Sequence, residues 1–115
     1  MNAKILIVDD DPDMVELLRF ALTEAGYSAC TATTGTEALA EAERSSPDLV
    51  VLDLLLPELN GFNVCEHLRR NQATASVPIS MITGLPRQFP RLAGMEAGVS
   101  AYVNKPGQRH ELVSR

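Results

Sequence analysis

The sequence predicts a single α/β domain whose strands form a parallel sheet. Apolar runs of strand length alternate with segments of helical periodicity, and the connections between them are short. The 115 residues, 45% of them apolar, suffice for an ordinary core, since a chain of this size buries roughly two-thirds of its unfolded surface. The whole chain, 1–115, is therefore expected to be one domain. Five polar side chains follow directly on the apolar runs: Asp9, Asp10, Asp53, Thr83 and Lys105.

The N-terminal elements are marked by their boundary residues. A first strand is expected over residues 4–9. The helix after it begins with Asp11 as N-cap and Pro12 as its first residue, and Gly26 ends it. Residues 28–32 alternate in polarity, which favours an edge strand with one wetter face.

The middle of the chain supplies the strand expected at the centre of the sheet. A short helix over residues 36–45 precedes it. The strand over residues 49–53 is apolar without interruption until its terminal Asp53, which is typical of a strand covered on both faces. A Leu-Pro and an Asn-Gly pair then mark a loop, and a helix follows over residues 62–71.

The C-terminal third holds two more strands, over residues 78–83 and 100–104. Pro90 and Gly98 bracket a short helix between them. The residues beyond Pro106 leave room for about two helical turns, so a fifth helix is expected to be truncated.

The strand order follows from the position of the acidic residues. Asp10 meets Asp53 only if the first and third strands are neighbours in the sheet. The order 2-1-3-4-5, taken partly by analogy with other doubly wound sheets, satisfies this and places the two weakest strands at the edges. The carboxylates then lie at the switch point of the sheet, where such folds bind ligands. Three acids packed that closely repel one another, and a divalent cation is the simplest relief.

Composition argues against several classes of function. The net charge of −5 and the absence of Trp disfavour nucleic-acid binding by this domain. No apolar run approaches the roughly eighteen residues that a membrane helix needs. Cys30 and Cys65 lack metal-ligand spacing and are expected to be buried small hydrophobes, which fits a reducing, cytoplasmic compartment.

Four short motifs occur in order along the chain. They are residues 5–10 (ILIVDD), Leu52-Asp53 followed by Pro57 and Gly61, residues 82–84 (ITG), and residues 102–106 (YVNKP). Together, and at these spacings, they resemble the receiver domain of bacterial two-component response regulators over essentially the whole chain. The resemblance implies a flavodoxin-like fold with five parallel strands and helices on both faces.

The resemblance also implies the chemistry of the acidic residues. Asp53 is the expected phosphoacceptor, taking a phosphoryl group from a histidine of a sensor kinase or phosphotransfer protein. Asp9 and Asp10 would hold Mg²⁺ together with Asp53 and the backbone carbonyl of Leu55.

Three further residues would complete the implied switch. Thr83 would hydrogen-bond a phosphoryl oxygen, and Lys105 would pair with the phosphorylated carboxylate. Tyr102 would turn inward on activation. The resemblance thus implies a signalling switch rather than an enzyme, acting on an output domain or downstream protein. A second copy of the chain is a candidate partner, and the chain is expected to be a piece of a longer regulator or a shortened form of one.

The chain departs from the family pattern at positions near the phosphoryl site. Leu55 and Leu85 stand two residues after Asp53 and Thr83, where polar side chains in the family help to place the attacking water. Two leucines predict slow self-dephosphorylation. Gly107 replaces a common Phe, which together with the short fifth helix weakens the case for the usual dimer surface.

Three other functions remain open from the residues alone. A haloacid-dehalogenase phosphatase would use an Asp-x-Asp pair such as Asp9 and Asp11. It also needs a further acidic pair after its lysine, whereas Glu111 is the only acidic residue after Lys105. A flavodoxin-like mononucleotide binder would need a phosphate loop rich in Ser, Thr and Gly, whereas this loop is rich in Asp. A degenerate receiver would act only as a protein-binding module.

Overall fold

The computed structural model describes residues 3–54, 56, 59–83 and 101–104 of the chain. Their strands form a parallel sheet in the order β2-β1-β3-β4-β5. The strands are β1 (Lys4–Val8), β2 (Ser28–Ala32), β3 (Leu49–Asp53), β4 (Ile79–Thr83) and β5 (Ala101–Asn104). The order of these strands is the predicted one, with β2 at an edge and β3 inside the sheet.

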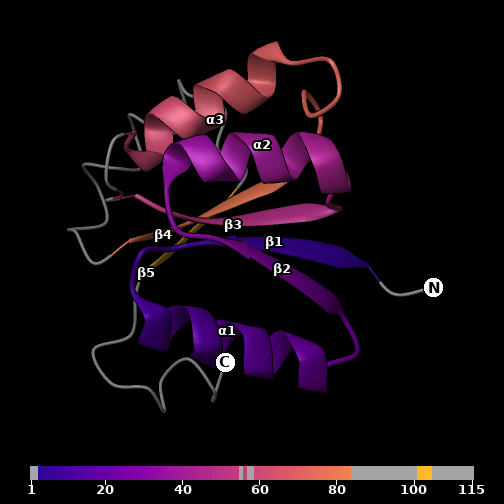
Figure 1. The fold of residues 1–115 in the computed structure, drawn as a ribbon, viewed down its shortest axis with the longest axis vertical. Coiled ribbons are helices and arrows are strands. Elements are labelled where there is room, and N and C mark those ends of the chain that lie inside the picture. Colours follow the sequence, from indigo (N-terminus) through magenta and orange to yellow (C-terminus); the bar gives the residue numbers. More distant parts are fainter. Residues whose placement is uncertain (1–2, 55, 57–58, 84–100, 105–115) are drawn as a thin grey trace.

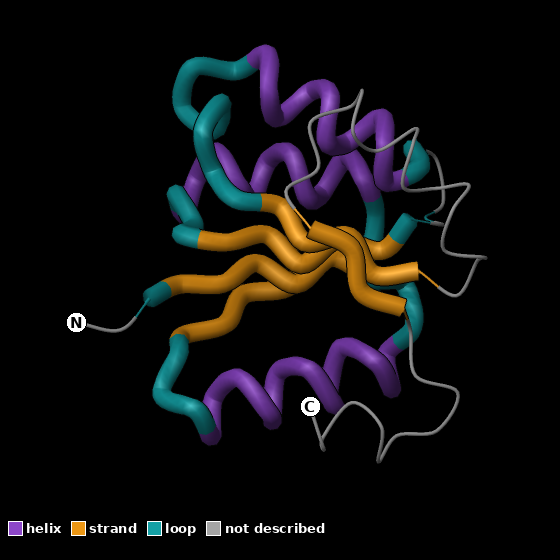
Figure 2. Tube along the Cα trace, turned by 180° about the vertical axis from the view of Figure 1, so that it is seen from behind, coloured by secondary structure: helices purple, strands orange, loops and turns teal. Residues whose placement is uncertain are grey.

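Helices cover both faces of this sheet (Figure 1). Helix α1 (Pro12–Glu24) lies on one face, and α2 (Gly35–Ser45) and α3 (Gly61–Arg70) lie side by side on the other. The view from behind shows the same three layers (Figure 2). The predicted doubly wound α/β class is confirmed. The helix expected near Pro90 and the truncated fifth helix fall outside the described residues.

Two hydrophobic clusters hold the layers together, one on each face. Successive side chains of a strand point to opposite faces, so each strand divides its residues between the clusters. Leu6 and Val8 pack with α2 and α3, whereas Ile5 and Ile7 pack with α1. None of the described helices is long and apolar enough to cross a membrane.

Helix α1 begins and ends with the predicted boundary residues. The side chain of Asp11 accepts a hydrogen bond from the backbone N–H of Asp13 at 3.0 Å, and Pro12 is the first helical residue. Gly26 has φ +96°, and its N–H donates to the carbonyl of Thr23 at 3.0 Å. The N–H of Tyr27 donates to the carbonyl of Leu22 at 3.0 Å, which completes a Schellman motif.

The buried stripe of α1 is narrow. Val15 and Leu18 are its buried residues, while Met14 and Leu22 are partly buried against the same cluster. Ala25, the C-cap of the helix, is exposed.

Several element boundaries differ from those predicted by one residue. Helices α2 and α3 each begin at a glycine, Gly35 and Gly61, after the N-caps Thr34 and Asn60. Each cap side chain accepts a hydrogen bond from a backbone N–H in the first turn, at 3.1 and 3.0 Å respectively. Strand β1 ends at Val8, so Asp9 lies just beyond it.

The two cysteines are free thiols, and both are at least partly buried. Cys65, on α3, is fully buried as predicted, whereas Cys30, on edge strand β2, is only half-buried. The difference follows from position, because an edge strand is covered on fewer sides than a helix packed inward.

Candidate functional site

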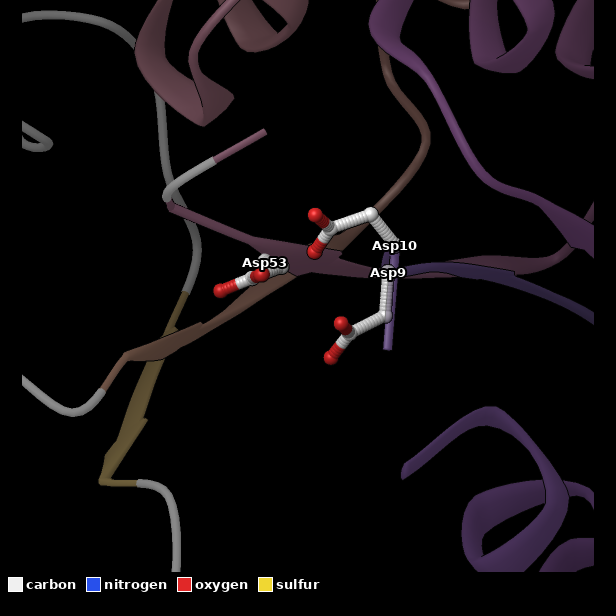
Figure 3. A group of neighbouring side chains, drawn as sticks. All are labelled: Asp9, Asp10 and Asp53. Carbon is white, nitrogen blue, oxygen red and sulfur yellow. The ribbon is translucent and has the colours of Figure 1, made fainter. Parts of the chain in front are cut away.

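Three carboxylates gather at the carboxyl-terminal edge of the sheet. One carboxylate oxygen from each of Asp9, Asp10 and Asp53 lies within 4.8 Å of those of the other two. Figure 3 shows them at the ends of β1 and β3, grouped around one space. The sequence-based expectation that these residues meet is therefore correct in geometry.

The register of β1 and β3 explains the meeting. Val8 pairs with Leu52, so the residues that follow them, Asp9 and Asp53, come at the same level. Asp53 follows Val51 by two positions and so points to the α1 side of the sheet. Asp9 and Asp53 are only 2% and 4% exposed, whereas Asp10 is exposed to solvent. Two buried acids beside an exposed one form a site that is open on one side.

Backbone hydrogen bonds hold the two buried acids in place. The N–H of Asp9 donates to the carbonyl of Ala32 in β2 at 3.1 Å, which continues the strand pairing beyond Val8. A carboxylate oxygen of Asp9 accepts the N–H of Asp11 at 2.9 Å and so links the site to the start of α1. After Asp53, the N–H of Leu54 donates to the carbonyl of Ile82 in β4 at 3.1 Å.

The oxygen cluster fits a small divalent cation. Mg²⁺ binds oxygen ligands octahedrally at about 2.0–2.1 Å, so two of its ligands lie roughly 2.9–4.2 Å apart. A cluster within 4.8 Å reaches this spacing through small side-chain rotations, which exposed Asp10 is free to make. Hard carboxylate oxygens are also the ligand type that such a cation prefers.

The structure describes only part of the remaining predicted site. Thr83 ends β4 and pairs with Asn104, which ends β5, so both backbones reach the edge that carries Asp53. Tyr102 lies in β5 opposite Met81. Leu55 and Lys105 lie outside the described residues.

Two glycines, Gly35 and Gly61, shape this edge; the sequence pattern gave neither of them a role at the site, and Gly61 entered only as part of a motif. A Cβ atom at Gly61 would lie 2.6 Å from the carbonyl oxygen of Asp53. Gly61 was assigned to a loop because Asn-Gly pairs are common in turns. The signal that could have placed it in the helix was Asn60, which is a good N-cap residue.

Comparison with known proteins assigns the family. The family described as response regulator receiver domain matches residues 5–115. The chain is 44% identical over 115 residues to the alkaline phosphatase synthesis transcriptional regulatory protein PhoP of Bacillus subtilis, covering all of this chain and 47% of PhoP. It is 39% identical over 112 residues to the DNA-binding dual master transcriptional regulator RpaA of Synechocystis, covering 97% of this chain and 46% of RpaA. The chain thus spans about half the length of these relatives.

Solved structures give the same answer at the level of the fold. The chemotaxis protein CheY4 of Vibrio cholerae superposes with a TM-score of 0.90 at 29% identity, covering 99% of this chain and 95% of CheY4. The receiver domain of the sensor histidine kinase PA1611 of Pseudomonas aeruginosa superposes with a TM-score of 0.86 at 30% identity, covering 99% and 93% of the two chains. That structure holds a magnesium ion coordinated in its active-site cleft.

The family match also separates the open alternatives. It favours a receiver domain over a haloacid-dehalogenase phosphatase and over a mononucleotide binder. The parallel sheet, the acidic cluster at its carboxyl-terminal edge and the relatives agree in one assignment. The chain belongs to the response regulator receiver domain family, the signalling domain of two-component systems.

Proposed function

We propose that this domain is a phosphorylation-dependent switch in which Asp53 accepts a phosphoryl group from a histidine of a sensor kinase or phosphotransfer protein. The observation that carries the proposal is the convergence of the Asp9, Asp10 and Asp53 carboxylates within 4.8 Å. A fold that needed only stability would gain nothing from three like charges at one edge.

The proposed transfer is an in-line displacement at phosphorus. A carboxylate oxygen of Asp53 attacks the phosphorus of the donor phosphohistidine and forms an acyl phosphate. The bond between phosphorus and the donor imidazole nitrogen breaks, and its electron pair stays on that nitrogen, which takes up a proton. Such transfers depend mainly on positioning and on charge neutralisation. The pairing of β3 with β1 on one side and with β4 on the other supplies the positioning of Asp53.

Mg²⁺ is the proposed cofactor of this step. Asp9, Asp10 and Asp53 would hold it, with the backbone carbonyl of Leu55 completing the set of protein ligands. The cation would offset the charge of the carboxylates and of the incoming phosphoryl group. The magnesium in the cleft of the PA1611 receiver supports this assignment.

The proposed switch uses three more residues. Thr83 would bond a phosphoryl oxygen, Lys105 would pair with the modified carboxylate, and Tyr102 would move inward as Thr83 shifts. Inverting a two-state population needs roughly 5.5 kcal/mol of differential interaction, more than one hydrogen bond and one ion pair supply. We therefore expect an incomplete shift unless an output domain or a second copy also favours the active form.

The downstream partner is proposed from the relatives. PhoP and RpaA are transcriptional regulators about twice as long as this chain, so an output domain that controls transcription is the expected recipient of the signal. The domain itself, with net charge −5, is not expected to bind nucleic acid.

Labelling with acetyl phosphate tests the proposal. With Mg²⁺ present, the intact protein should gain one acid-stable, base-labile phosphoryl group, and Asp53→Asn should gain none. Asp48→Asn is the matched control, since Asp48 is an exposed acid at the opposite edge of the sheet and should label normally. An unlabelled wild-type protein would leave the degenerate, protein-binding receiver as the better description.

The lifetime of the label tests the role of the two leucines near the site. Because Leu55 and Leu85 should exclude water, we expect slow loss of the phosphoryl group, and Leu55→Asn should accelerate it. Rapid loss from the purified wild-type phosphoprotein in Mg²⁺ would contradict this expectation.

A further inference from the structure

Helix α3 starts in direct contact with the backbone of the proposed phosphoacceptor. A Cβ at Gly61, its first residue, would lie 2.6 Å from the Asp53 carbonyl oxygen and 2.9 Å from the Cα of Leu54. Both atoms belong to the backbone, so neither can turn aside as the end of a side chain could. The N–H of Gly61 also donates to the carbonyl of Leu54 at 2.7 Å. Glycine at this position is required by space.

The requirement at Gly61 is purely steric. Among the described glycines, only Gly26 has a positive φ, at +96°. The backbone at Gly61 is therefore one that alanine adopts without strain. An alanine there must displace either the start of α3 or the backbone of Asp53 and Leu54.

A second glycine supports the same segment from the other side. A Cβ at Gly35, the first residue of α2, would lie 2.6 Å from the Cβ of Leu59 and 2.9 Å from Cγ2 of Val64. The carbonyl oxygen of Leu59 would lie at 3.2 Å. The start of α2 thus lies in close contact with Leu59 and Val64, on either side of the start of α3. The start of α3 in turn lies in close contact with the backbone of Asp53.

We propose that Gly61 and Gly35 are positioning residues for the acidic site, which set the depth of Asp53 relative to Asp9 and Asp10 through the starts of α3 and α2. The inference rests on the proposed cation-assisted phosphorylation of Asp53. It adds that the site is held by two close contacts on the α2/α3 face, one of Gly61 with the backbone of Asp53 and Leu54 and one of Gly35 with Leu59 and Val64, although the carboxylates open on the α1 side. Added bulk at either glycine shifts the phosphoacceptor without changing any ligand.

The primary test is the cation affinity of two alanine variants. Mg²⁺ binding is measured by calorimetry and by the amide shift of Asp53 in ¹H–¹⁵N spectra. Gly61→Ala should bind Mg²⁺ at least about tenfold more weakly, and its phosphorylation by acetyl phosphate should slow further, because displacement of a reacting group by about 1 Å can cost about a hundredfold in rate. Gly35→Ala should show the same loss in smaller measure, since it acts through Leu59.

Gly26→Ala is the control for stability alone. A Cβ at Gly26 meets nothing within 4 Å, so its cost is confined to backbone strain at a positive φ. This variant should unfold at lower urea concentration yet bind Mg²⁺ with the wild-type affinity. A loss of affinity in Gly26→Ala equal to that in Gly61→Ala would show that general destabilisation is responsible, and would overturn the inference.

A double variant tests the contact between α2 and the loop. Leu59→Gly removes the nearer of the two side-chain atoms that an alanine at position 35 would strike, so Gly35→Ala/Leu59→Gly should regain part of the cation affinity lost in Gly35→Ala. This double variant still tests the inference if Gly61→Ala fails to fold. Absence of any regain, with Leu59→Gly itself near wild type, would contradict the proposed path.

The outcomes distinguish this inference from the proposed function. If the wild-type protein neither binds Mg²⁺ nor takes up the label, the proposed function fails. If the wild type does both, and Gly61→Ala and Gly35→Ala match it in affinity and rate, only the positioning role is wrong.

Discussion

Charged side chains are arranged differently at the two edges of the sheet. At the amino-terminal edge, the N–H of Lys4 donates to a carboxylate oxygen of Asp48 at 2.8 Å, and the N–H of Asp48 donates back to the carbonyl of Lys4 at 2.7 Å. The Lys4 ammonium also donates to the carbonyl of Ser45 at 2.9 Å. At the carboxyl-terminal edge, three groups of the same sign share one space (Figure 3).

The difference separates a structural edge from a functional one. Lys4, Ser45 and Asp48 close a reciprocal set of bonds that joins β1 to the turn before β3. The acidic edge instead brings three like charges together, and such departures from structural economy concentrate where a protein binds or reacts. Substitutions at the acidic edge should therefore change the response to Mg²⁺, whereas substitutions at the amino-terminal edge should change stability.

The largest expected effect is the response of the acidic edge to a cation. Mg²⁺ at a hundred times its dissociation constant should raise the free energy of unfolding by about 2.7 kcal/mol, because it binds the folded state alone. Asp10→Asn should lose most of this gain while raising stability slightly in chelator, since one of three neighbouring like charges is removed. Urea unfolding with Mg²⁺ and with chelator measures both. Equal Mg²⁺ stabilisation of wild type and variant would erase the contrast between the edges.

The next effect concerns the opposite edge. Asp48→Ala removes the acceptor for the Lys4 N–H, and should cost about 1 kcal/mol of stability. Its Mg²⁺ affinity should remain that of the wild type, as calorimetry would report. A shift in affinity would mean that the two edges are energetically coupled through β1 and β3.

A smaller effect is expected at the end of α2, beside the same amino-terminal edge. Ser46, its C-cap, has φ 49° and ψ 63°, a left-handed conformation that costs a residue with a side chain. Ser46→Gly should relieve this strain and stabilise the protein by about 0.5 kcal/mol, net of the added freedom of glycine in the unfolded chain. Ser46→Ala keeps the strain and is the control. Thermal unfolding of both variants would show a higher midpoint only for glycine.

The smallest effect near neutral pH belongs to Cys65, which lies away from both edges. Burial raises the pKa of its thiol, while the nearby Arg69 lowers it and Glu66 raises it by smaller amounts. The folded protein thus keeps this proton to higher pH than the unfolded chain does. Its contribution to stability is complete below the unfolded pKa and is lost as pH rises above it.

A pH series of urea unfolding checks this direction. Wild-type stability should fall more steeply above about pH 9 than that of Cys65→Ala, whereas the two slopes should agree below about pH 8. Parallel profiles across the alkaline range would show that the thiol does not titrate in this way.

The structural features that were predicted correctly depend mainly on residues close together in the sequence. Helix α1 begins after Asp11, at Pro12, and ends before Gly26 as predicted, because capping interactions involve only residues close together in the sequence. The central place of β3 was visible in its uninterrupted apolar run. The meeting of Asp9 with Asp53 required only that the strand order be right.

The features that were not predicted depend on contacts between segments distant in the sequence. Gly35 and Gly61 were placed just outside their helices, Gly61 because an Asn-Gly pair is typical of a turn. The crowding that requires glycine at these positions comes from Leu59, Val64 and the backbone of Asp53 and Leu54. Such crowding leaves no periodicity in the sequence. The roles of Leu55, Thr83, Tyr102 and Lys105 stay predictions, which the labelling and cation experiments address.

The pairing of Val8 with Leu52 has a consequence for how this chain can vary. Side chains along a strand alternate with a period of two, so deleting one residue from β3 would turn its terminal carboxylate to the opposite side of the sheet. Length changes in the turn before β3 would leave that parity untouched. Natural insertions and deletions should therefore be tolerated in the connections that feed the strands, and excluded from the strands that end in an acid.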